Sequence, residues 1–216
     1  MDCGTSTFDR AMAIDYYQRV ADSYDRQWKT CTNETLNRVE AYLPDLAGKA
    51  ILDYGCGTGE LIWRMLLSSP RLSQVVGYDP STAMLEQAHN KIQLLPGDLR
   101  DKICLQCNHA HDTTFDLIVS TSVLHYLQQP QATLEYWHSL LQPEGVVILL
   151  DYSKAGWLPR YFEWAIRWID QAHHQAYYPA QAQTMLADVG FDVDQSEMFT
   201  INRFWQEFII KASTPQ

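Results

Sequence analysis

The sequence has no apolar run long enough to cross a membrane, although 46% of its 216 residues are hydrophobic. Its first residues, Met1–Thr5, also lack the positively charged and apolar regions of a secretory signal peptide. Both absences predict a cytoplasmic protein without a membrane span. Repeats and low-complexity segments are missing as well, so we expect one well-filled domain over residues 1–216.

Basic residues are scarce, with 16 Lys and Arg against 26 Asp and Glu and a formal net charge of -10. No cluster of Lys or Arg interrupts this acidic balance. Because proteins bind nucleic acid largely through basic side chains that neutralise phosphates, the sequence predicts no nucleic-acid partner. It leaves open whether the protein is a monomer or a homodimer.

The five cysteines are irregularly placed and give no disulfide framework, which a chain of this length does not need. Cys104 and Cys107 have the spacing of a redox or zinc pair, but they fall in an expected strand, where residues three apart point to opposite faces. We therefore predict two buried thiols. His109 and His111 would share a strand face, yet no further ligand is spaced to complete a metal site, so we predict no metal.

The glycine-rich segment Ile51–Glu60 lacks the lysine that a phosphate-binding loop requires. Its three glycines also miss the spacing of the dinucleotide-binding fingerprint, whose third glycine falls one residue later. An apolar strand precedes these glycines and a helical pattern follows them, so the turn allows a small ligand to lie against the main chain. Asp53 and Glu60 would repel a pyrophosphate and favour a cation such as a sulfonium or an amine.

Four segments in order resemble the motifs of the class I methyltransferases that use S-adenosylmethionine, namely Leu52–Gly59, Val75–Leu85, Phe115–Ser120 and Leu141–Gly145. The resemblance implies an α/β fold with a Rossmann-like, seven-stranded, mostly parallel sheet, helices on both faces and an antiparallel last strand. It also implies S-adenosylmethionine as cofactor, S-adenosylhomocysteine as product and a small-molecule methyl acceptor.

The residue pattern agrees with this architecture. Residues 8–30 carry a helical apolar stripe, which predicts one or two N-terminal helices within residues 1–44. Residues 45–151 alternate strands with helices, as a parallel sheet requires. The expected core strands are Ala50–Leu52, Gln74–Asp79, Phe115–Val123 and Val146–Asp151, and the expected helices are Glu60–Leu67, a Ser81-capped helix to Gln93, and Pro130–Leu141. Residues 179–216 give a helix to Val189, closed by Gly190, and a hairpin of Val193–Ile201 and Phe204–Ala212.

The remaining core strand allows two interpretations. Leu95–Asp98 would end a strand with the acidic residue that many family members place at adenine, but its adjacent Pro and Gly indicate a loop. We prefer Lys102–Asn108 as the strand and Pro96–Asp101 as a connection, because the former holds a β-favouring run. Asn108 and His109 then stand where the family often has Asp-Ala, a departure that weakens the expected recognition of the adenine amino group.

Residues 152–178 are rich in aromatic side chains, with Trp157, Tyr161, Trp164 and Trp168 at helical spacing. A helix packed on the core accounts for most of them. The same helical segment would also form a cap over the carboxyl ends of the strands, where ligands bind in open α/β sheets. The two roles can use different faces of one helix.

The resemblance implies a cofactor site formed by Asp53, Gly55, Cys56, Gly57, Gly59, Asp79, Pro80, Ser81, Met84, Asn108, His109, Ser120 and Thr121, with Tyr17 and Tyr24 closing over it. Asp79 ends a strand where a carboxylate accepts the ribose hydroxyl hydrogens. Asp53 would orient the loop or approach the ligand amine, and Ser120 and Thr121 would flank the methionine end. Ser81 is equally explained as a helix cap, and Met84 as a core residue.

Methyl transfer from a sulfonium is a direct displacement, so orientation supplies much of the rate and no covalent nucleophile is needed. A hydroxyl or phenol acceptor would benefit from a general base near neutral pH. His125, directly after an expected strand, is the first candidate, although a helix-start histidine bonded to backbone explains it equally well. His173 and Tyr177 come next, because their spacing resembles a pattern that precedes the last helix in many small-molecule methyltransferases.

The aromatic segment and the acidic charge favour a small aromatic or apolar acceptor, with the methylated atom undetermined. A protein side chain as acceptor would need an open groove instead of a pocket. A regulatory protein that binds S-adenosylmethionine without turnover would need only the glycines and Asp79. A nicotinamide-dependent oxidoreductase is disfavoured by the glycine spacing.

Overall fold

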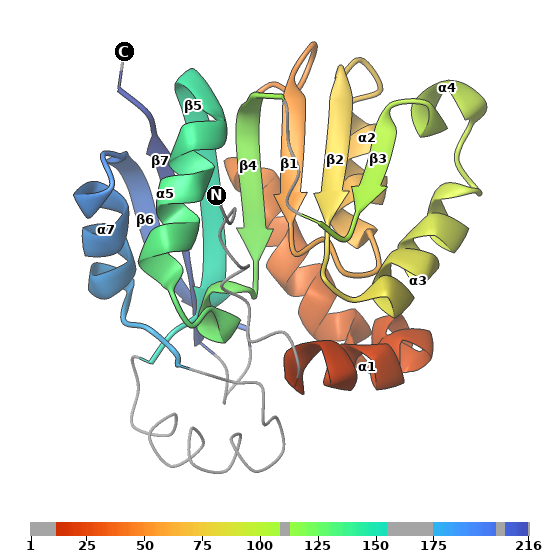
Figure 1. The fold of residues 1–216 in the computed structure, drawn as a ribbon, viewed down its shortest axis with the longest axis horizontal. Coiled ribbons are helices and arrows are strands. Elements are labelled where there is room, and N and C mark those ends of the chain that lie inside the picture. The colour runs from red at the N-terminus through yellow and green to blue at the C-terminus, as the bar shows by residue number, and fades with distance from the viewer. Residues whose placement is uncertain (1–11, 109–112, 155–174, 202–205, 216) are drawn as a thin grey trace, which may run out of the picture.

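The computed structural model describes residues 12–108, 113–154, 175–201 and 206–215. They form a seven-stranded sheet with the order β3-β2-β1-β4-β5-β7-β6, and helices lie against both faces (Figure 1). The strands are β1 (Ala50–Tyr54), β2 (Gln74–Tyr78), β3 (Ile103–Gln106), β4 (Phe115–Thr121), β5 (Leu141–Tyr152), β6 (Asp192–Thr200) and β7 (Gln206–Ser213). The helices are α1 (Met12–Tyr42), α2 (Glu60–Ser68), α3 (Thr82–Ile92), α4 (Gly97–Arg100), the 3-10 helix η1 (Leu124–Tyr126), α5 (Pro130–Leu140) and α7 (Pro179–Asp188).

The sheet is parallel over its first five strands in space, and β7 is antiparallel to both of its neighbours, β5 and β6. The predicted Rossmann-like sheet with a reversed last strand and a C-terminal hairpin is therefore confirmed. The predicted aromatic helix falls mostly on residues 155–174, which lie outside the described residues.

Each face of the sheet buries its own apolar cluster. Successive strand residues point to opposite faces, so Leu52 packs with Trp137 on the α5 and α7 side, whereas Ile51 packs with Val39 and Met65 on the α1 and α2 side. All five side chains are fully or almost fully buried. Coverage of both faces explains why the central strands read as continuous apolar runs.

The observed ends of four elements can be compared with the predicted ends, and local interactions explain each result. Ser81 caps α3 as predicted, because its Oγ accepts a hydrogen bond from the Met84 amide at 3.3 Å, and Gly190 closes α7 with φ 99°. β4 stops at Thr121 instead of Val123, because Ser122 has a left-handed φ of 56° that no strand can continue. β5 starts earlier than predicted, since Leu141 already pairs with Phe115 across an irregularity in the register.

The third strand confirms the preferred interpretation of the sequence, because β3 spans Ile103–Gln106 and the preceding connection contains only the short helix α4. The predicted burial of the two thiols is wrong, since Cys104 and Cys107 are both exposed. The prediction assumed a strand covered on both sides, whereas β3 is an edge strand and Cys107 lies beyond its end. At the N-terminus, the described residues form one helix of 31 residues, α1.

Candidate functional site

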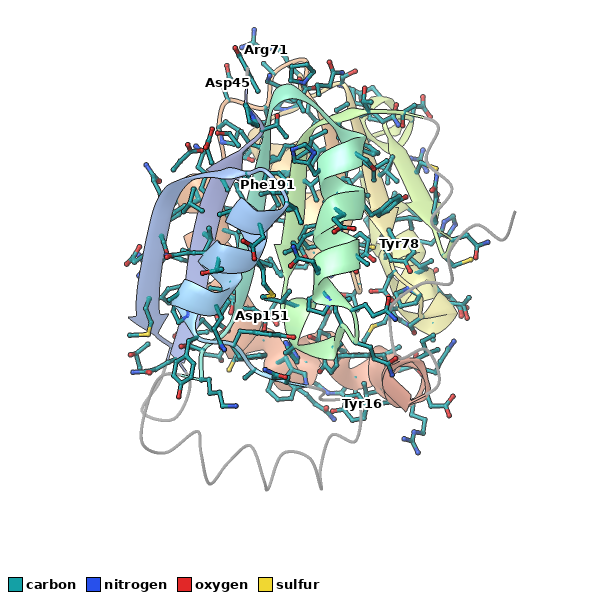
Figure 2. The ribbon with its side chains drawn as sticks, turned by 60° about the vertical axis from the view of Figure 1, so that its left-hand side comes forward. Tyr16, Asp45, Arg71, Tyr78, Asp151 and Phe191 are labelled. Atoms are coloured by element: carbon teal, nitrogen blue, oxygen red, sulfur yellow. The ribbon has the colours of Figure 1, made fainter. Side chains whose placement is uncertain are left out.

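Two cavities are lined by residues of α1 and of the loops that follow the parallel strands, at the carboxyl ends of these strands. Helix α1 crosses this end of the sheet (Figure 1). Figure 2 shows Tyr16 of α1 and Asp151 of β5 at this end, and Asp45 and Arg71 at the opposite end. Ligands of open α/β sheets bind at the carboxyl ends, so both cavities lie where the fold favours a site.

The first cavity, about 490 Å³, is lined by Ile14, Tyr17, Tyr24, Gly55, Gly57, Asp79, Pro80, Ser81, Met84, Thr121, Ser122, Val123 and Tyr126. The second cavity, about 650 Å³, is lined by Tyr24, Trp28, Cys31, Thr32, Thr35, Leu36, Asp53, Gly55, Cys56, Gly57, Thr58, Glu60, Leu61, Thr121, Ser122 and Tyr152. Five residues line both cavities, namely Tyr24, Gly55, Gly57, Thr121 and Ser122. The cavities therefore adjoin at the glycine loop.

The glycine loop after β1 needs glycine for two separate reasons. Gly55, Gly57 and Gly59 all have positive φ, at 83°, 51° and 73°. In addition, a Cβ at Gly55 would lie 2.3 Å from the Cγ2 of Val123, so no side chain fits there. Left-handed backbone and close approach together expose main chain to the cavities, as the sequence predicted.

Asp79 holds this loop to the start of α3. Its Oδ2 accepts a hydrogen bond from the Gly57 amide at 2.9 Å, and its Oδ1 accepts one from the Ser81 amide at 2.8 Å. Burial raises the pKa of Asp79 to about 6, although these two amide donors act in the opposite direction. The carboxylate lines the first cavity, where its remaining lone pairs can accept from ligand hydroxyls.

Asp53, on β1, is 1% exposed and lines the second cavity. Neither of its carboxylate oxygens has a hydrogen-bond partner among the described residues. Burial, and then the charge of Asp79, raises the pKa of Asp53 to about 7. A buried carboxylate without partners is unfavourable, so this cavity is electrostatically prepared for a cationic group.

A further buried carboxyl group, which was not predicted, lies behind the second cavity. Glu207 of β7 is 1% exposed and pairs across the strands with Tyr152, and its carboxyl accepts from the Thr35 hydroxyl at 3.1 and 3.2 Å. Burial raises its pKa to about 8, with Asp151 adding to the shift and Thr35 opposing it. A glutamate directly before the apolar run Phe208–Ile210 of β7 was the available sequence signal.

Tyrosines from α1 and η1 enclose the first cavity. The hydroxyl groups of Tyr17 and Tyr126 are 2.8 Å apart, and their rings meet edge to face at 5.8 Å. Tyr24 contacts the Tyr17 ring at 5.9 Å and lines both cavities. Burial, followed by the charge of Asp79, raises the pKa of Tyr24 well above its usual value, so its hydroxyl stays protonated.

Polar contacts fasten α1 over the cavities. The Thr58 hydroxyl donates to Asp25 Oδ1 at 2.6 Å, and Lys91 forms an ion pair with Asp25 at 2.8 Å. Further along, Gln18 donates to the Thr82 hydroxyl at 2.9 Å. These contacts join α1 to the glycine loop and to α3, so both cavities depend on the position of α1.

His125 is buried and paired, and it lines neither cavity. Its Nδ1 is 2.6 Å from Asp151 Oδ1, and it is 2% exposed. Its ring contacts Tyr126 at 3.9 Å between centroids, which places it directly behind a cavity wall. Tyr177 is also buried, with a pKa raised by burial and by Asp151, and His173 lies outside the described residues.

The structure brings most of the predicted cofactor residues together. Those that line a cavity are Tyr17, Tyr24, Asp53, Gly55, Cys56, Gly57, Asp79, Pro80, Ser81, Met84 and Thr121. Gly59 begins α2 beside them, whereas Ser120 is fully buried and absent from both linings. Asn108 is exposed and lines neither cavity, and His109 lies outside the described residues.

Several lining residues were missed, chiefly Ser122, Val123, Tyr126 and Tyr152. All four follow or end strands β4 and β5, so their position after a buried strand was the usable signal. No group of three or more potential metal ligands occurs within the part of the chain that the structure describes. In that same part, no helix is long and apolar enough to span a bilayer.

Comparison with known proteins shows that the core of the sheet, which holds most of the site, is similar to methyltransferase domains. The family model described as a methyltransferase domain matches residues 52–147. A tRNA U34 carboxymethyltransferase from Idiomarina loihiensis is 32% identical over 129 residues, which is 58% of this chain and 39% of that protein. A malonyl-[acyl-carrier protein] O-methyltransferase from Halalkalibacterium halodurans is 35% identical over 111 residues, covering 49% of this chain and 40% of that protein. The chain thus spans about two fifths of the length of these relatives.

Solved structures share the fold over nearly the whole chain. Magnesium protoporphyrin IX methyltransferase from Synechocystis with bound SAH is 21% identical, has a TM-score of 0.77 and covers 95% of this chain and 99% of its own. A putative methyltransferase from Bacillus halodurans is 15% identical, with a TM-score of 0.72 over 85% of this chain and 100% of its own. At these identities the likeness establishes the fold alone.

Proposed function

We propose that this chain, which carries a class I, S-adenosylmethionine-dependent methyltransferase domain, transfers the methyl group of S-adenosylmethionine to a small, uncharged, aromatic or apolar acceptor. The observation that carries the proposal is the buried, unpartnered carboxylate of Asp53 beside a glycine loop that Asp79 fastens. A sulfonium amino acid joined to a ribose supplies a cation for the first carboxylate and hydroxyl donors for the second.

The residues present fit this cofactor. Asp53 would hold its ammonium group, and Asp79 would accept from the ribose hydroxyls. Met84 and Pro80, in the first cavity, offer apolar contact for a base. The hydroxyl group of Thr32, in the second cavity, can donate to the amino-acid carboxylate. When bound, the cofactor supplies an electrophilic methyl carbon.

The chain itself supplies orientation and exclusion of water. The shared wall of the two cavities, including Tyr24 and Thr121, would hold the acceptor atom in line with the methyl carbon and the sulfur. Alignment of this kind is worth up to roughly 7–11 kcal/mol of the barrier. Because α1 covers both cavities, the same helix that aligns the reactants also shields them from solvent.

The wall chemistry supports a small acceptor without charge. Tyr17 and Tyr126 present aromatic faces and a paired hydroxyl group to the first cavity, next to Val123. Carboxylates on two sides, Asp53 and Asp79, disfavour an anionic acceptor. An aromatic wall of this kind suits a phenol or quinol, whose ring can pack against the tyrosine rings.

For a hydroxyl acceptor we propose His125 as the base. Asp151 accepts the Nδ1 hydrogen of His125, which fixes the tautomer and leaves Nε2 as the basic nitrogen. Contact between the His125 and Tyr126 rings places the pair next to the wall of the first cavity, which Tyr126 lines. Tyr177, close to Asp151, would help to hold this pair, and His173 stays a candidate from sequence.

Calorimetric titration tests the proposal with S-adenosylmethionine, S-adenosylhomocysteine and NADH as separate ligands. We expect saturable binding of the two adenosyl compounds and none of NADH. Asp79→Asn, which keeps the size of the side chain, should weaken adenosyl binding by about 10- to 100-fold. Binding of NADH alone, or none by folded protein, would contradict the proposal. Turnover with phenols and quinols is then screened by release of S-adenosylhomocysteine.

A further inference from the structure

Residues 104–107 have the Cys-x-x-Cys spacing of a redox pair, and the proposed function makes no use of them. Both thiols of the pair are exposed, whereas Cys31 is half-buried and Cys56 is buried. Between them, Gln106 donates from its Nε2 to Cys104 Sγ at 3.3 Å. An oxidant in solvent can therefore reach both sulfurs of the pair, and they can be joined if the chain between them bends.

We propose that Cys104 and Cys107 form a reversible redox site, which a low-molecular-weight disulfide oxidises to an intrachain disulfide. When this bond forms, the carboxyl end of β3 leaves its partner strand β2. One protein thiolate attacks the small disulfide, whose sulfur–sulfur bond breaks and releases one thiolate. The other protein thiolate attacks the mixed disulfide and releases the second. Two protein thiols are thus oxidised, the small disulfide is reduced to two thiols, and these take up the two protons.

The strand conformation keeps the two sulfurs of the pair apart. Strand residues advance by about 3.3 Å each, so the Cα atoms of residues three apart are separated by about 10 Å. A disulfide needs about 4.4–6.8 Å between its Cα atoms. Cys104 lies inside β3 and Cys107 follows its last residue, so the bond closes only if Leu105 and Gln106 turn out of the strand. The paired strand and the disulfide therefore exclude each other.

The carboxyl end of β3 is held weakly. The strand has four residues and lies at the edge of the sheet, where it pairs with β2. Its apolar residues Ile103 and Leu105 are only partly buried. Gln106 Oε1 is buried without a hydrogen-bond partner among the described residues, and leaving the strand would expose this atom to water. Local opening of such an edge costs less free energy than unfolding of the whole sheet.

The same end of β3 supports the two cavities. The Gln106 carbonyl oxygen accepts a hydrogen bond from the Asp79 amide at 3.1 Å. Leu105 packs over Gly77, where a Cβ would lie 2.8 Å from Leu105 Cδ2 and 3.0 Å from Cys56 Sγ. Asp79 and Cys56 each belong to a cavity wall. Release of the strand end therefore withdraws support from the first cavity at Asp79 and from the glycine loop near Cys56.

Oxidation of the pair and binding of the cofactor should consequently oppose each other. This coupling rests on the proposed function, because it takes the two cavities as the site of S-adenosylmethionine. If oxidation weakens cofactor binding by some factor, binding must favour the dithiol by the same factor, since linkage is reciprocal. A factor of about 10 lies within the range that is typical of coupled sites.

The first experiment equilibrates the whole chain with defined ratios of oxidised and reduced glutathione. We expect the protein to lose the mass of two hydrogens, and peptide mass analysis should map the new bond to Cys104 and Cys107. Hydrogen exchange of residues 103–106 should become faster in the oxidised form. The double variant Cys104→Ser, Cys107→Ser is the matched control, and its exchange should not respond to oxidised glutathione.

The second experiment measures the coupling by calorimetric titration of the reduced and oxidised forms with S-adenosylhomocysteine. We expect about 10-fold weaker binding by the oxidised wild type. The double variant should bind equally before and after treatment with oxidised glutathione. A similar loss of affinity in the double variant would assign the effect to other thiols and contradict the proposal.

The outcomes separate the redox site from the proposed function. If no disulfide formed, or if it left the exchange of residues 103–106 unchanged, the redox site would be overturned. Equal affinities of the oxidised and reduced forms would overturn the coupling to the cavities. If the reduced, folded protein did not bind S-adenosylhomocysteine, the proposed function would fail, while the mass and exchange measurements would still decide the redox site.

Discussion

Gly55 combines a positive φ with a close approach to Val123, whereas Gly48 has a similar φ of 73° and open space around its Cβ position. Both Gly→Ala variants should lose about 1 kcal/mol of stability through backbone strain. Gly55→Ala should lose roughly 1–3 kcal/mol more, since Val123 must move. Urea denaturation of the two variants measures the difference in the free energy of unfolding. Equal losses would show that Val123 moves away from the new methyl group at no energetic cost.

The raised pKa values of Asp53 and Glu207 predict an unusual pH dependence of stability. Both groups keep their protons in the folded protein up to about pH 7 and 8, whereas the unfolded chain releases them near pH 4. The folded state therefore binds more protons between these values, and stability falls as the pH rises from about 4 to 8, by on the order of a few kcal/mol.

Denaturation midpoints of the ligand-free protein at several pH values check this expectation. The double variant Asp53→Asn, Glu207→Gln should show a clearly flatter profile, because neither replacement titrates. If the wild type and the double variant had the same pH dependence of stability, both carboxyl groups would ionise in the folded protein as they do in water. Cofactor affinity should change in the opposite sense, rising with pH as Asp53 becomes charged.

His125 can be tested as a base with a variant that spares its partner. His125→Asn retains an amide hydrogen to donate to Asp151 but has no titrating nitrogen. We expect kcat to fall by about 10²- to 10⁴-fold while the affinity for S-adenosylmethionine is unchanged. Steady-state kinetics with an active hydroxyl acceptor supplies the measurement, and near-normal kcat would assign His125 a structural role.

At the level of elements, α1 covers both cavities, and polar contacts join it to the glycine loop and to α3. Asp25 is the central contact, because it binds both Thr58 and Lys91. Asp25→Ala should release the cofactor faster while lowering stability by at most about 1 kcal/mol, since the ion pair is partly exposed. Stopped-flow displacement measures the release rate. Asp15→Ala, which removes an exposed carboxylate of the same helix, is the control and should release at the wild-type rate.

The sequence was most informative where one signal dominated. Apolar runs and the glycine segment identified β1, β2 and the loop between β1 and α2, and Ser81 marked the start of α3. The predicted burial of Cys104 and Cys107 was wrong, because burial depends on the position of a strand in the sheet. The periodicity of the sequence does not reveal that β3 is an edge strand. Similarly, Ser120 and Thr121 are adjacent, and only the three-dimensional path shows that Thr121 lines the cavities while Ser120 is buried.

The paired groups were beyond the sequence for a different reason. His125 was named from its place after a strand, but its partner Asp151 comes from β5 and meets it only through the parallel pairing of β4 with β5. Glu207 and Thr35 are separated by 172 positions along the chain. Contacts of this range follow from topology, so local pattern cannot reveal them.

For the molecule as a whole, the net charge of -10 gives a clear expectation about RNA, even though relatives are named tRNA U34 carboxymethyltransferases. Because the sequence holds no cluster of Lys or Arg to neutralise phosphates, the chain should not bind tRNA at about 0.15 M salt. Filter binding with bulk tRNA checks this. Saturable retention that weakens steeply as salt increases would contradict the expectation and make tRNA the first acceptor to examine.

The position of β7 between β5 and β6 bears on how the protein is made. β6 leaves the ribosome before β7, yet it has no neighbour in the sheet until β7 has paired with β5. During synthesis, β6 therefore stays unpaired, and β5 is an exposed and strongly apolar edge strand of the parallel sheet. That edge is an aggregation hazard for as long as the last strand is missing. Conditions that slow translation of residues 206–213 should thus lower the soluble yield more than slow codons elsewhere.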